Sequence, residues 1–232
     1  MNCILFTKYF HYVSVKGIKS RYFIRKGKAK IKLEEFEAAC IELDNAINSN
    51  PVDYLAYYYK GNARFGMADY PGAIENYSKS ITYRPSFAEA YCSRGNALFH
   101  LRKFPEALVE LDKSLKLNPL YPLALCYRGI TKYELNDLKG ALDDYSKAIK
   151  LDPYDVVSLY NRGNLKLQTE DPRGAMLDFN QAIKLDPSYA IAYVGRGNAK
   201  LAIGSECGAE VDWKKAEKLQ HEAEKRVFSE TG

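Results

Sequence analysis

Residues 91–119 read YCSRGNALFHLRKFPEALVELDKSLKLNP, and their Gly95, Ala107 and Pro119 recur along the chain at a fixed interval. Glycine returns every 34 residues, at Gly27, Gly61, Gly95, Gly129, Gly163 and Gly197. In the same register stand Ala39, Ala73, Ala107, Ala141, Ala175 and Ala209, and also Pro51, Pro85, Pro119, Pro153 and Pro187. A fixed period of this length indicates a solenoid of stacked repeats, each burying its apolar surface against its neighbours.

Each repeat divides into two amphipathic helices. In the unit at 88–121, Ala107, Leu108, Leu111 and Leu115 follow the spacing of a helical stripe. The register proline ends the second helix because proline cannot continue a helix. Glycine inside a helix costs about 1 kcal/mol relative to Ala, so the register glycine predicts a close approach of the two helices. Large side chains are expected beside that contact: Tyr77, Leu111, Tyr145, Phe179 and Trp213.

This 34-residue helix-turn-helix pattern resembles the tetratricopeptide repeat over about residues 20–223. The resemblance implies an all-α fold, a right-handed α-solenoid of antiparallel helix pairs. The chain departs from the family pattern directly before each register glycine, at Lys26, Lys60, Arg94, Arg128, Arg162 and Arg196. Three residues after the glycine it departs again, at Lys30, Arg64, Leu98, Lys132, Lys166 and Lys200. We expect long aliphatic stems to cover apolar surface there while the charges reach water.

We predict six repeats, at 20–53, 54–87, 88–121, 122–155, 156–189 and 190–223. Residues 1–19 are basic and aromatic and have no register glycine. They form either a degenerate half-repeat that covers the first repeat or a leader without fixed structure. In the last repeat His221 replaces the register proline and Glu217 replaces an apolar residue. A terminal repeat needs a polar outer face, so we predict a charged capping helix at 210–228 and a tail at 229–232.

Charge and cysteine content limit the classes of protein. Residues 1–33 contain nine basic and no acidic residues, whereas the rest of the chain contains 25 basic and 29 acidic residues. The basicity is therefore confined to the N-terminal end. The five cysteines form no CxxC motif, which argues against a disulfide framework or a zinc site and favours a reducing compartment. No apolar run approaches the ~20 residues of a membrane-spanning helix, and we predict a cytoplasmic protein.

The sequence contains no recognisable catalytic constellation. His11, His100 and His221 lie in different parts of the chain, without partners spaced as in a triad or a metal site. No phosphate-binding loop, zinc-protease motif or nucleophile elbow occurs. We therefore predict that the protein is not an enzyme and that it binds no cofactor and no metal.

The resemblance implies that the first helices of the repeats line a concave groove. Register positions on these helices predict a peptide-binding surface that is apolar and aromatic, with Asn at intervals. It comprises Tyr58, Asn62, Phe65, Glu89, Cys92, Asn96, Phe99, His100, Tyr133, Tyr160, Asn164 and Asn198. An amide side chain both donates and accepts hydrogen bonds, so the Asn residues could bind the main chain of an extended peptide. Alternatively, each binds a neighbouring helix or water.

Some members of the family hold the C-terminal carboxylate of a partner with a Lys three residues before the register glycine. In this chain that position holds Ile24, Tyr58, Cys92, Cys126, Tyr160 and Val194. None of these residues is basic, so we expect no carboxylate clamp of that kind.

The sequence predicts a protein-interaction scaffold that binds a peptide or helix of a so far unidentified partner protein in its groove. The alternative is a protein that binds nucleic acid or an anionic membrane surface through its N-terminal segment. The basic patch for that alternative comprises Arg25, Lys26, Lys28, Lys30 and Lys32. A third interpretation of the same residues is a solvated face that keeps the end of the solenoid soluble.

Overall fold

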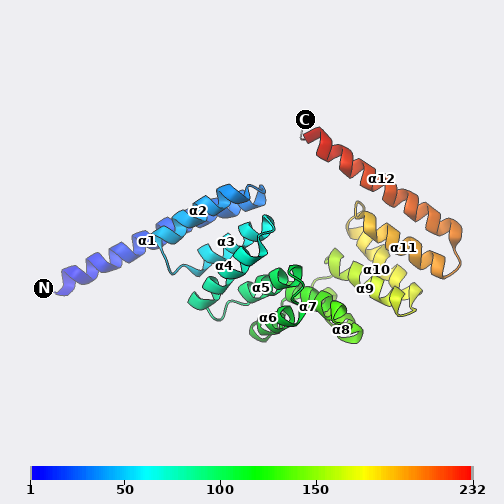
Figure 1. Cartoon of the computed structure of the whole chain (residues 1–232), viewed down its shortest axis with the longest axis horizontal. Helices are drawn as coiled ribbons and strands as arrows, with labels where there is room; N and C mark the ends of the chain where they lie inside the picture. Colours follow the sequence, from blue (N-terminus) through cyan, green and yellow to red (C-terminus); the bar gives the residue numbers. More distant parts are fainter. Residues whose placement is uncertain (1, 231–232) are drawn as a thin grey trace. The chain divides into compact units, whose positions relative to one another are not determined.

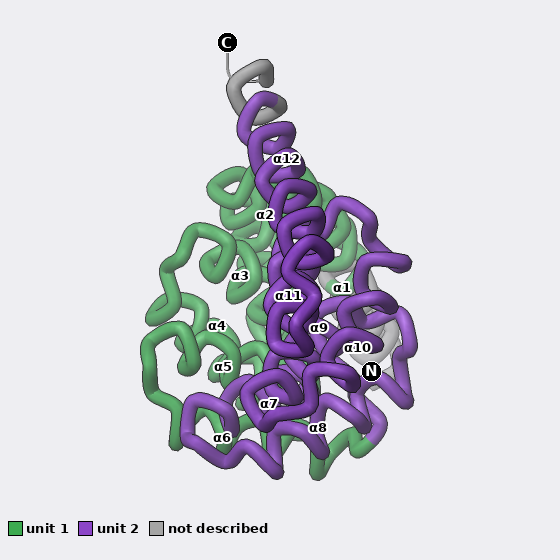
Figure 2. Tube along the Cα trace, turned by 90° about the vertical axis from the view of Figure 1, so that its right-hand side faces the viewer, with its two compact units in different colours: residues 1–119 green, residues 120–232 purple. Residues whose placement is uncertain are grey.

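The computed structural model describes the backbone of residues 2–230 and the side chains of residues 17–225. Within the described residues it contains twelve helices and no strand (Figure 1). The predicted all-α solenoid of helix pairs is thereby confirmed. The chain forms two compact units, residues 1–119 and 120–232 (Figure 2).

The first unit contains three helix pairs. Its helices are α1 (Asn2–Lys32), α2 (Phe36–Ser49), α3 (Tyr54–Gly66), α4 (Tyr70–Tyr83), α5 (Ala88–His100) and α6 (Phe104–Leu117). Each first helix packs against the second helix of its own pair, and α2 and α4 also pack against α3 and α5, the first helices of the pairs that follow them. The core is therefore a chain of small clusters, such as the one in which Ala73 and Tyr77 of α4 meet Ala97 of α5.

The second unit repeats this arrangement. Its helices are α7 (Pro122–Glu134), α8 (Leu138–Leu151), α9 (Val156–Gln168), α10 (Pro172–Leu185), α11 (Ala190–Ala202) and α12 (Glu206–Glu230). Ala175 and Phe179 of α10 bury Ala199 of α11, just as Tyr145 of α8 meets Leu165 of α9. This position of the first helix is apolar and buried against the preceding second helix, as Ala199 in α11 and Leu165 in α9.

The register glycines lie where the two helices of a pair are closest. A Cβ atom on Gly61 would lie 2.5 Å from Cε1 of Tyr77, and one on Gly163 would lie 2.8 Å from Cε1 of Phe179. Any larger residue would collide with the aromatic side chain on the second helix of the same pair. The glycine and the large side chain are therefore two halves of one packing contact, as the repeated pattern indicated.

The turn inside each pair has one residue in the left-handed region. At this position φ lies between 57° and 62° for five residues that are not glycine: Glu34, Ala68, Arg102, Asn136 and Glu170. The last pair has Gly204 there, with φ of 82°. Asp69, Asp137 and Asp171 then cap the second helices by accepting a hydrogen bond from a backbone N–H three residues later.

The basic residues before the register glycines form ion pairs with buried carboxylates. Arg162 on α9 donates to Asp178 on α10 through Nε at 2.9 Å and Nη2 at 2.7 Å. Arg196 pairs with Asp212 in the same way, at 2.8 and 2.6 Å. Lysines three residues after the glycine reach the same carboxylates, as Lys166 does at 2.8 Å from Asp178. The expectation that these charges reach water is therefore wrong for these residues, because their partners are buried acids.

The same basic residues also reach back to the preceding pair. Arg162 Nη1 donates to Ser146 Oγ at 3.3 Å, and Arg196 Nη1 donates to Asn180 Oδ1 at 2.8 Å. In the first unit, Lys60 forms an ion pair with Asp44 at 2.5 Å. We call this interaction the reach-back contact. It joins the residue directly before a register glycine to a residue on the second helix of the preceding pair. The sequence separation between these two residues is the same in each repeat.

The two terminal helices are the longest. Helix α1 has 31 residues, and the predicted boundary at residue 19 falls inside it. The choice between a half-repeat and a leader depends on side chains of residues 1–16, which lie outside the described residues. Helix α12 has 25 residues, from Glu206 to Glu230, and contains the predicted capping segment. Among the described residues, no helix is both long and apolar enough to cross a bilayer.

Candidate functional site

An aromatic cluster occupies the C-terminal ends of α3 and α5. The ring of His100 stacks on Tyr70, with centroids 4.8 Å apart and planes inclined by 11°. His100 also meets the edge of Phe65 at 5.2 Å. Phe99 extends the cluster to Phe104, at 5.2 Å. The first unit therefore brings together three predicted groove residues, Phe65, Phe99 and His100.

The other end of α3 is also aromatic. Tyr58 is half-buried, and its ring packs edge-on against Phe87 at 5.0 Å. Burial raises the pKa of Tyr58, while hydrogen bonding with Ser93 and Asn62 lowers it, so the net pKa lies above its usual value. Glu89, in the first turn of α5, is half-buried.

The four asparagines after the register glycines fall into two classes. Tyr77 donates a hydrogen bond to Oδ1 of Asn62 at 2.9 Å, and Trp213 donates one to Oδ1 of Asn198 at 3.2 Å. Asn96 and Asn164 are half-buried, and neither side chain has a hydrogen-bond partner within the described part of the chain. The large residue of the adjoining second helix explains the difference, since Leu111 and Phe179 carry no donor.

The second unit offers a smaller set of predicted groove residues. Tyr160 on α9 is half-buried and meets Tyr189 edge-on at 5.7 Å. Asn164 follows one turn later on the same helix. Tyr133, near the end of α7, is 40% exposed. The amide of Asn164 beside an aromatic ring thus repeats the combination of Asn96 and Phe99 in the first unit.

Cys92 differs from the other predicted groove residues. Only 1% of its surface is exposed, and it belongs to the buried side of α5. The structure therefore places it behind the surface that a ligand could touch. Register position alone did not distinguish it from Asn96, because both lie on the side of the helix toward the predicted groove.

The five residues of the predicted basic patch do not form one surface. Lys26 pairs with Glu42 at 3.5 Å, and Lys30 pairs with Glu35 at 2.8 Å. Lys28 lies over the ring of Tyr59, 4.8 Å from its centroid. Arg25 and Lys32 are exposed. Helical periodicity distributes these residues around α1, so their cationic groups have different neighbours.

A pocket between α1 and α3 contains part of this basic set. Its basic side chains are Arg21, Arg25 and Lys28, and its aromatic side chains are Tyr54 and Tyr59. Arg21 and Tyr59 are not among the site residues predicted from the sequence. Arg21 lies one repeat before Leu55, in the register of the predicted groove, so the repeat pattern itself could have identified it. The chemistry of this pocket suits an anionic group next to an apolar or aromatic one.

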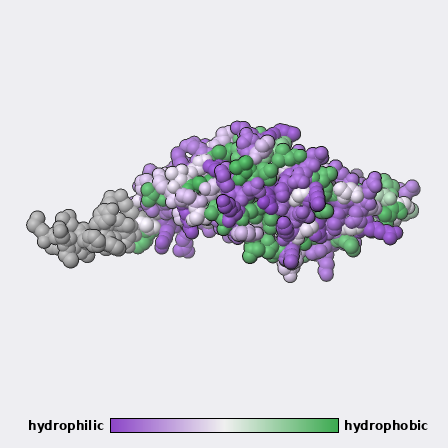
Figure 3. Space-filling view, turned by 90° about the horizontal axis from the view of Figure 1, so that it is seen from below, coloured by the Kyte–Doolittle hydropathy of each residue, from purple (hydrophilic) through white to green (hydrophobic). Residues whose placement is uncertain are grey.

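No group of three or more His, Cys, Asp or Glu side chains among the described residues could hold a metal ion. On the face seen in Figure 3, hydrophobic side chains stand in separate patches between hydrophilic ones. The features that stand out on the surface are therefore the aromatic rings and the unpaired amides of Asn96 and Asn164.

Comparison with known structures supports the fold. The chain is similar to MamA, with 22% identity and a TM-score of 0.63, covering 71% of this chain and 96% of that one. Its similarity to a structure described as the APC/C hetero-tetramer Cut9-Hcn1 has a TM-score of 0.80 at 16% identity, covering 87% of this chain and 40% of that one. YrrB, described as a TPR protein with an unusual peptide-binding site, matches at 20% identity with a TM-score of 0.60, covering 82% of this chain and 98% of YrrB.

Comparison of the sequence gives the family. No curated protein sequence matches the chain. Family models described as "Tetratricopeptide repeat" match residues 88–121, 122–155 and 156–189, and one described as "TPR repeat" matches residues 69–101. These matches follow the register of Gly95, Gly129 and Gly163. The chain therefore belongs to the tetratricopeptide repeat family.

Proposed function

We propose that the protein is a non-catalytic adaptor that binds a peptide or helix of a partner protein on the surface of its first helices. Tetratricopeptide repeats and their structural relatives support a protein-interaction scaffold in general. The observation that carries the more specific proposal is the pair of half-buried amides, Asn96 and Asn164, that the described residues leave without partners. The side-chain oxygen and nitrogen of both residues are not among the buried polar atoms that lack a partner, so they remain within reach of a ligand.

The chemistry of this surface suits an extended segment of polypeptide. A peptide main chain presents alternating donors and acceptors, and a primary amide can satisfy both kinds. Phe99 and His100 stand one turn from Asn96, and Tyr160 stands one turn from Asn164. Each amide could therefore fix the main chain while the neighbouring ring accepts an apolar side chain of the partner. Asn62 and Asn198 already accept internal hydrogen bonds, so we expect them to contribute less.

The pocket between α1 and α3 gives this surface an electrostatic preference. Arg21, Arg25 and Lys28 place three positive charges around it, and no acidic side chain other than Asp53 lines it. Asp53 accepts hydrogen bonds from Ser20 and from the backbone N–H of Leu55. We therefore expect a partner segment with an acidic residue where it reaches the first helix pair.

The experiment is affinity capture from the native cell with the full chain, followed by binding of each identified partner to purified variants. We expect the combination of Asn96→Ala, Phe99→Ala, Tyr160→Ala and Asn164→Ala to weaken binding at least tenfold. The matched control replaces exposed apolar residues of the second helices, Val109→Ala and Leu177→Ala, and should leave binding unchanged. A partner that binds both sets of variants equally would contradict the proposal.

One contact favours a second candidate function, the binding of nucleic acid. Lys28 lies over Tyr59 beside Arg25, and an aromatic ring flanked by cations can stack on a base and hold a phosphate. Single-stranded RNA is the probe. Binding should fall steeply with salt and should be lost in the variant Arg25→Gln, Lys28→Gln. Absence of binding, or binding that does not depend on salt, would exclude this function.

A further inference from the structure

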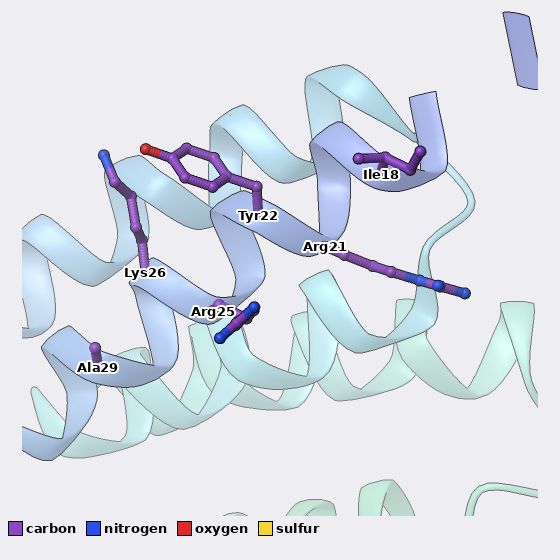
Figure 4. A pocket seen from close by; sticks show the side chains of 6 residues that line it. All are labelled: Ile18, Arg21, Tyr22, Arg25, Lys26 and Ala29. Atoms are coloured by element: carbon purple, nitrogen blue, oxygen red, sulfur yellow. The ribbon is translucent and has the colours of Figure 1, made fainter. Parts of the chain in front are cut away.

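The outer face of α1 forms an open hollow that nothing in the described structure covers. Its volume is about 750 Å³, and it is lined by Ile18, Arg21, Tyr22, Arg25, Lys26 and Ala29, all from α1 (Figure 4). Ile18 is 64% exposed and Tyr22 is 54% exposed. Among the described helices, α1 packs only against α2 and α3. An apolar strip within a basic surface is therefore left without a neighbour.

In the following repeats, the corresponding face is an interface. One repeat after Tyr22 and Ala29 stand Ala56 and Ala63 of α3, and both are fully buried in the cluster formed with Leu43 and Ala46 of α2. Ala97 of α5 is likewise buried against α4, and Ala199 of α11 against α10. At each of these places a second helix lies on the face. The hollow on α1 is thus the same interface without its second helix.

The reach-back contact indicates which chemical group a helix docked on α1 would provide. Lys60 reaches Asp44, Arg94 reaches Ser78, Arg162 reaches Ser146 and Arg196 reaches Asn180, each on the second helix that covers the face. Lys26 holds the equivalent position on α1. It pairs with Glu42 of its own helix pair at 3.5 Å, but no described residue stands where the reach-back partner would be. A docked helix would therefore place an oxygen opposite Lys26.

The charge of the face indicates whether the oxygen opposite Lys26 belongs to a carboxylate or to a neutral group. Arg21 and Arg25 flank Lys26, whereas the corresponding positions on α3 are Leu55 and Tyr59, and those on α11 are Ile191 and Gly195. The face on α1 therefore carries three positive charges where the others carry one. Charge complementarity favours carboxylates over neutral oxygens.

We propose that the outer face of α1 binds an acidic amphipathic helix of another protein, in the position that a second helix occupies in the other repeats. The helix places small apolar residues against Tyr22 and Ala29 and a carboxylate against Lys26. This surface is separate from the one formed by Asn96 and Phe99, although Arg21 and Arg25 also line the pocket between α1 and α3. The inference does not depend on the proposed function of that surface.

Two other occupants fit less well. A second copy stacked in repeat register would place Lys214 of α12 opposite Lys26, because Lys214 stands one repeat after Asn180, and like charges would repel. Residues 2–16 continue α1 as one helix, so they cannot lie on the outer face of the same helix. Neither occupant therefore supplies a carboxylate for Lys26.

The probe is a stapled, fluorescent peptide with the sequence of α2, FEAACIELDNAINS, in which serine replaces the cysteine. This helix contains three acidic residues and no basic residue, and within the chain it covers the equivalent face of α3. We expect saturable binding to the full chain by fluorescence anisotropy. Lys26→Glu should weaken binding at least about tenfold, and Asp44→Lys in the peptide should restore it. Ala29→Arg should block the face by bulk, and Lys116→Glu on α6 is the control that leaves binding unchanged.

Three results would overturn the proposal. The first is absence of binding, and the second is equal binding to the wild type and to both face variants, each shown to be folded by circular dichroism. The third is self-association in sedimentation that Lys26→Glu abolishes, which would assign the face to a second copy.

Discussion

Arg162 on α9 donates two hydrogen bonds to the carboxylate of Asp178 on α10, and the exposed fraction of Asp178 is only 3%. The third nitrogen of the same guanidinium donates to Ser146 on α8. One side chain therefore connects three consecutive helices. The equivalent arginine, Arg196, connects α10, α11 and α12 in the same manner.

Removing the buried carboxylate should be costly. Asp178→Ala leaves the charges of Arg162 and Lys166 without a partner in a shielded site, and we expect the free energy of unfolding to fall by about 3–5 kcal/mol. Urea unfolding followed by circular dichroism measures it. The variant Arg162→Met, Lys166→Met, Asp178→Leu should recover most of the loss, and Asp143→Ala, at an exposed acid, is the control. A loss no larger than that of the control would contradict the ion-pair network.

The last repeat should lose stability in acid. Burial raises the pKa of Asp212, but hydrogen bonds from Arg196 and Lys200 outweigh burial and hold the pKa below its usual value. A carboxyl group whose pKa is lower in the folded state stabilises that state above its unfolded pKa of about 4. This stabilisation is lost as the pH falls through the folded pKa. We expect Asp212→Asn to reduce the dependence of the free energy of unfolding on pH below about pH 5, and an unchanged dependence would contradict the pairing.

The register glycine should not tolerate a methyl group. In Gly61→Ala the new Cβ would lie 2.5 Å from Cε1 of Tyr77, and overpacking of this kind costs about 1–3 kcal/mol. The matched control is Gly17→Ala in α1, where no described atom beyond its chain neighbours and its own helix backbone lies within 4 Å of the new Cβ. There the higher helix propensity of Ala should stabilise the protein by up to about 1 kcal/mol. Thermal unfolding of both variants tests the contact, and equal effects of the same sign would argue against it.

The turn residue in the left-handed region should prefer glycine. Ala68 has φ of 57°, a conformation that costs an L-residue about 1 kcal/mol and glycine almost nothing. We expect Ala68→Gly to raise the free energy of unfolding by about 0.5 kcal/mol after the entropy of the unfolded chain is included. Asn136→Gly should gain less, because Asn tolerates this region. Destabilisation by Ala68→Gly would show that residue 68 does not adopt the left-handed conformation.

Sequence periodicity predicted the fold because each landmark has a local physical cause. Gly61 and Tyr77 fill one space, and Asp69 caps a helix through the backbone N–H of Gly72. The glycine contact recurs in every repeat and the aspartate cap in three of them, so both patterns are visible in a single chain. The ion pairs were visible too, since an acid follows Arg94, Arg162 and Arg196 at one constant spacing, but the sequence alone did not show that both partners would be buried.

The site was less predictable because specificity depends on departures from the register. Whether an Asn is internally bonded depends on the large residue of the adjoining second helix, which is Tyr77 for Asn62 and Leu111 for Asn96. The basic residues failed to form one patch because consecutive positions on α1 point in different directions. The outer face of α1 could be recognised only from the packing of its equivalents on α3, α5 and α11.

The most direct measurement of the central claim is photo-crosslinking of a captured partner to the full chain. A photoreactive amino acid replaces Phe99, on the surface of the first helices, or Val109, which is 52% exposed on the second helix α6. The proposed adaptor predicts that the partner crosslinks to position 99 and not to position 109. Crosslinking at position 109 alone would contradict it.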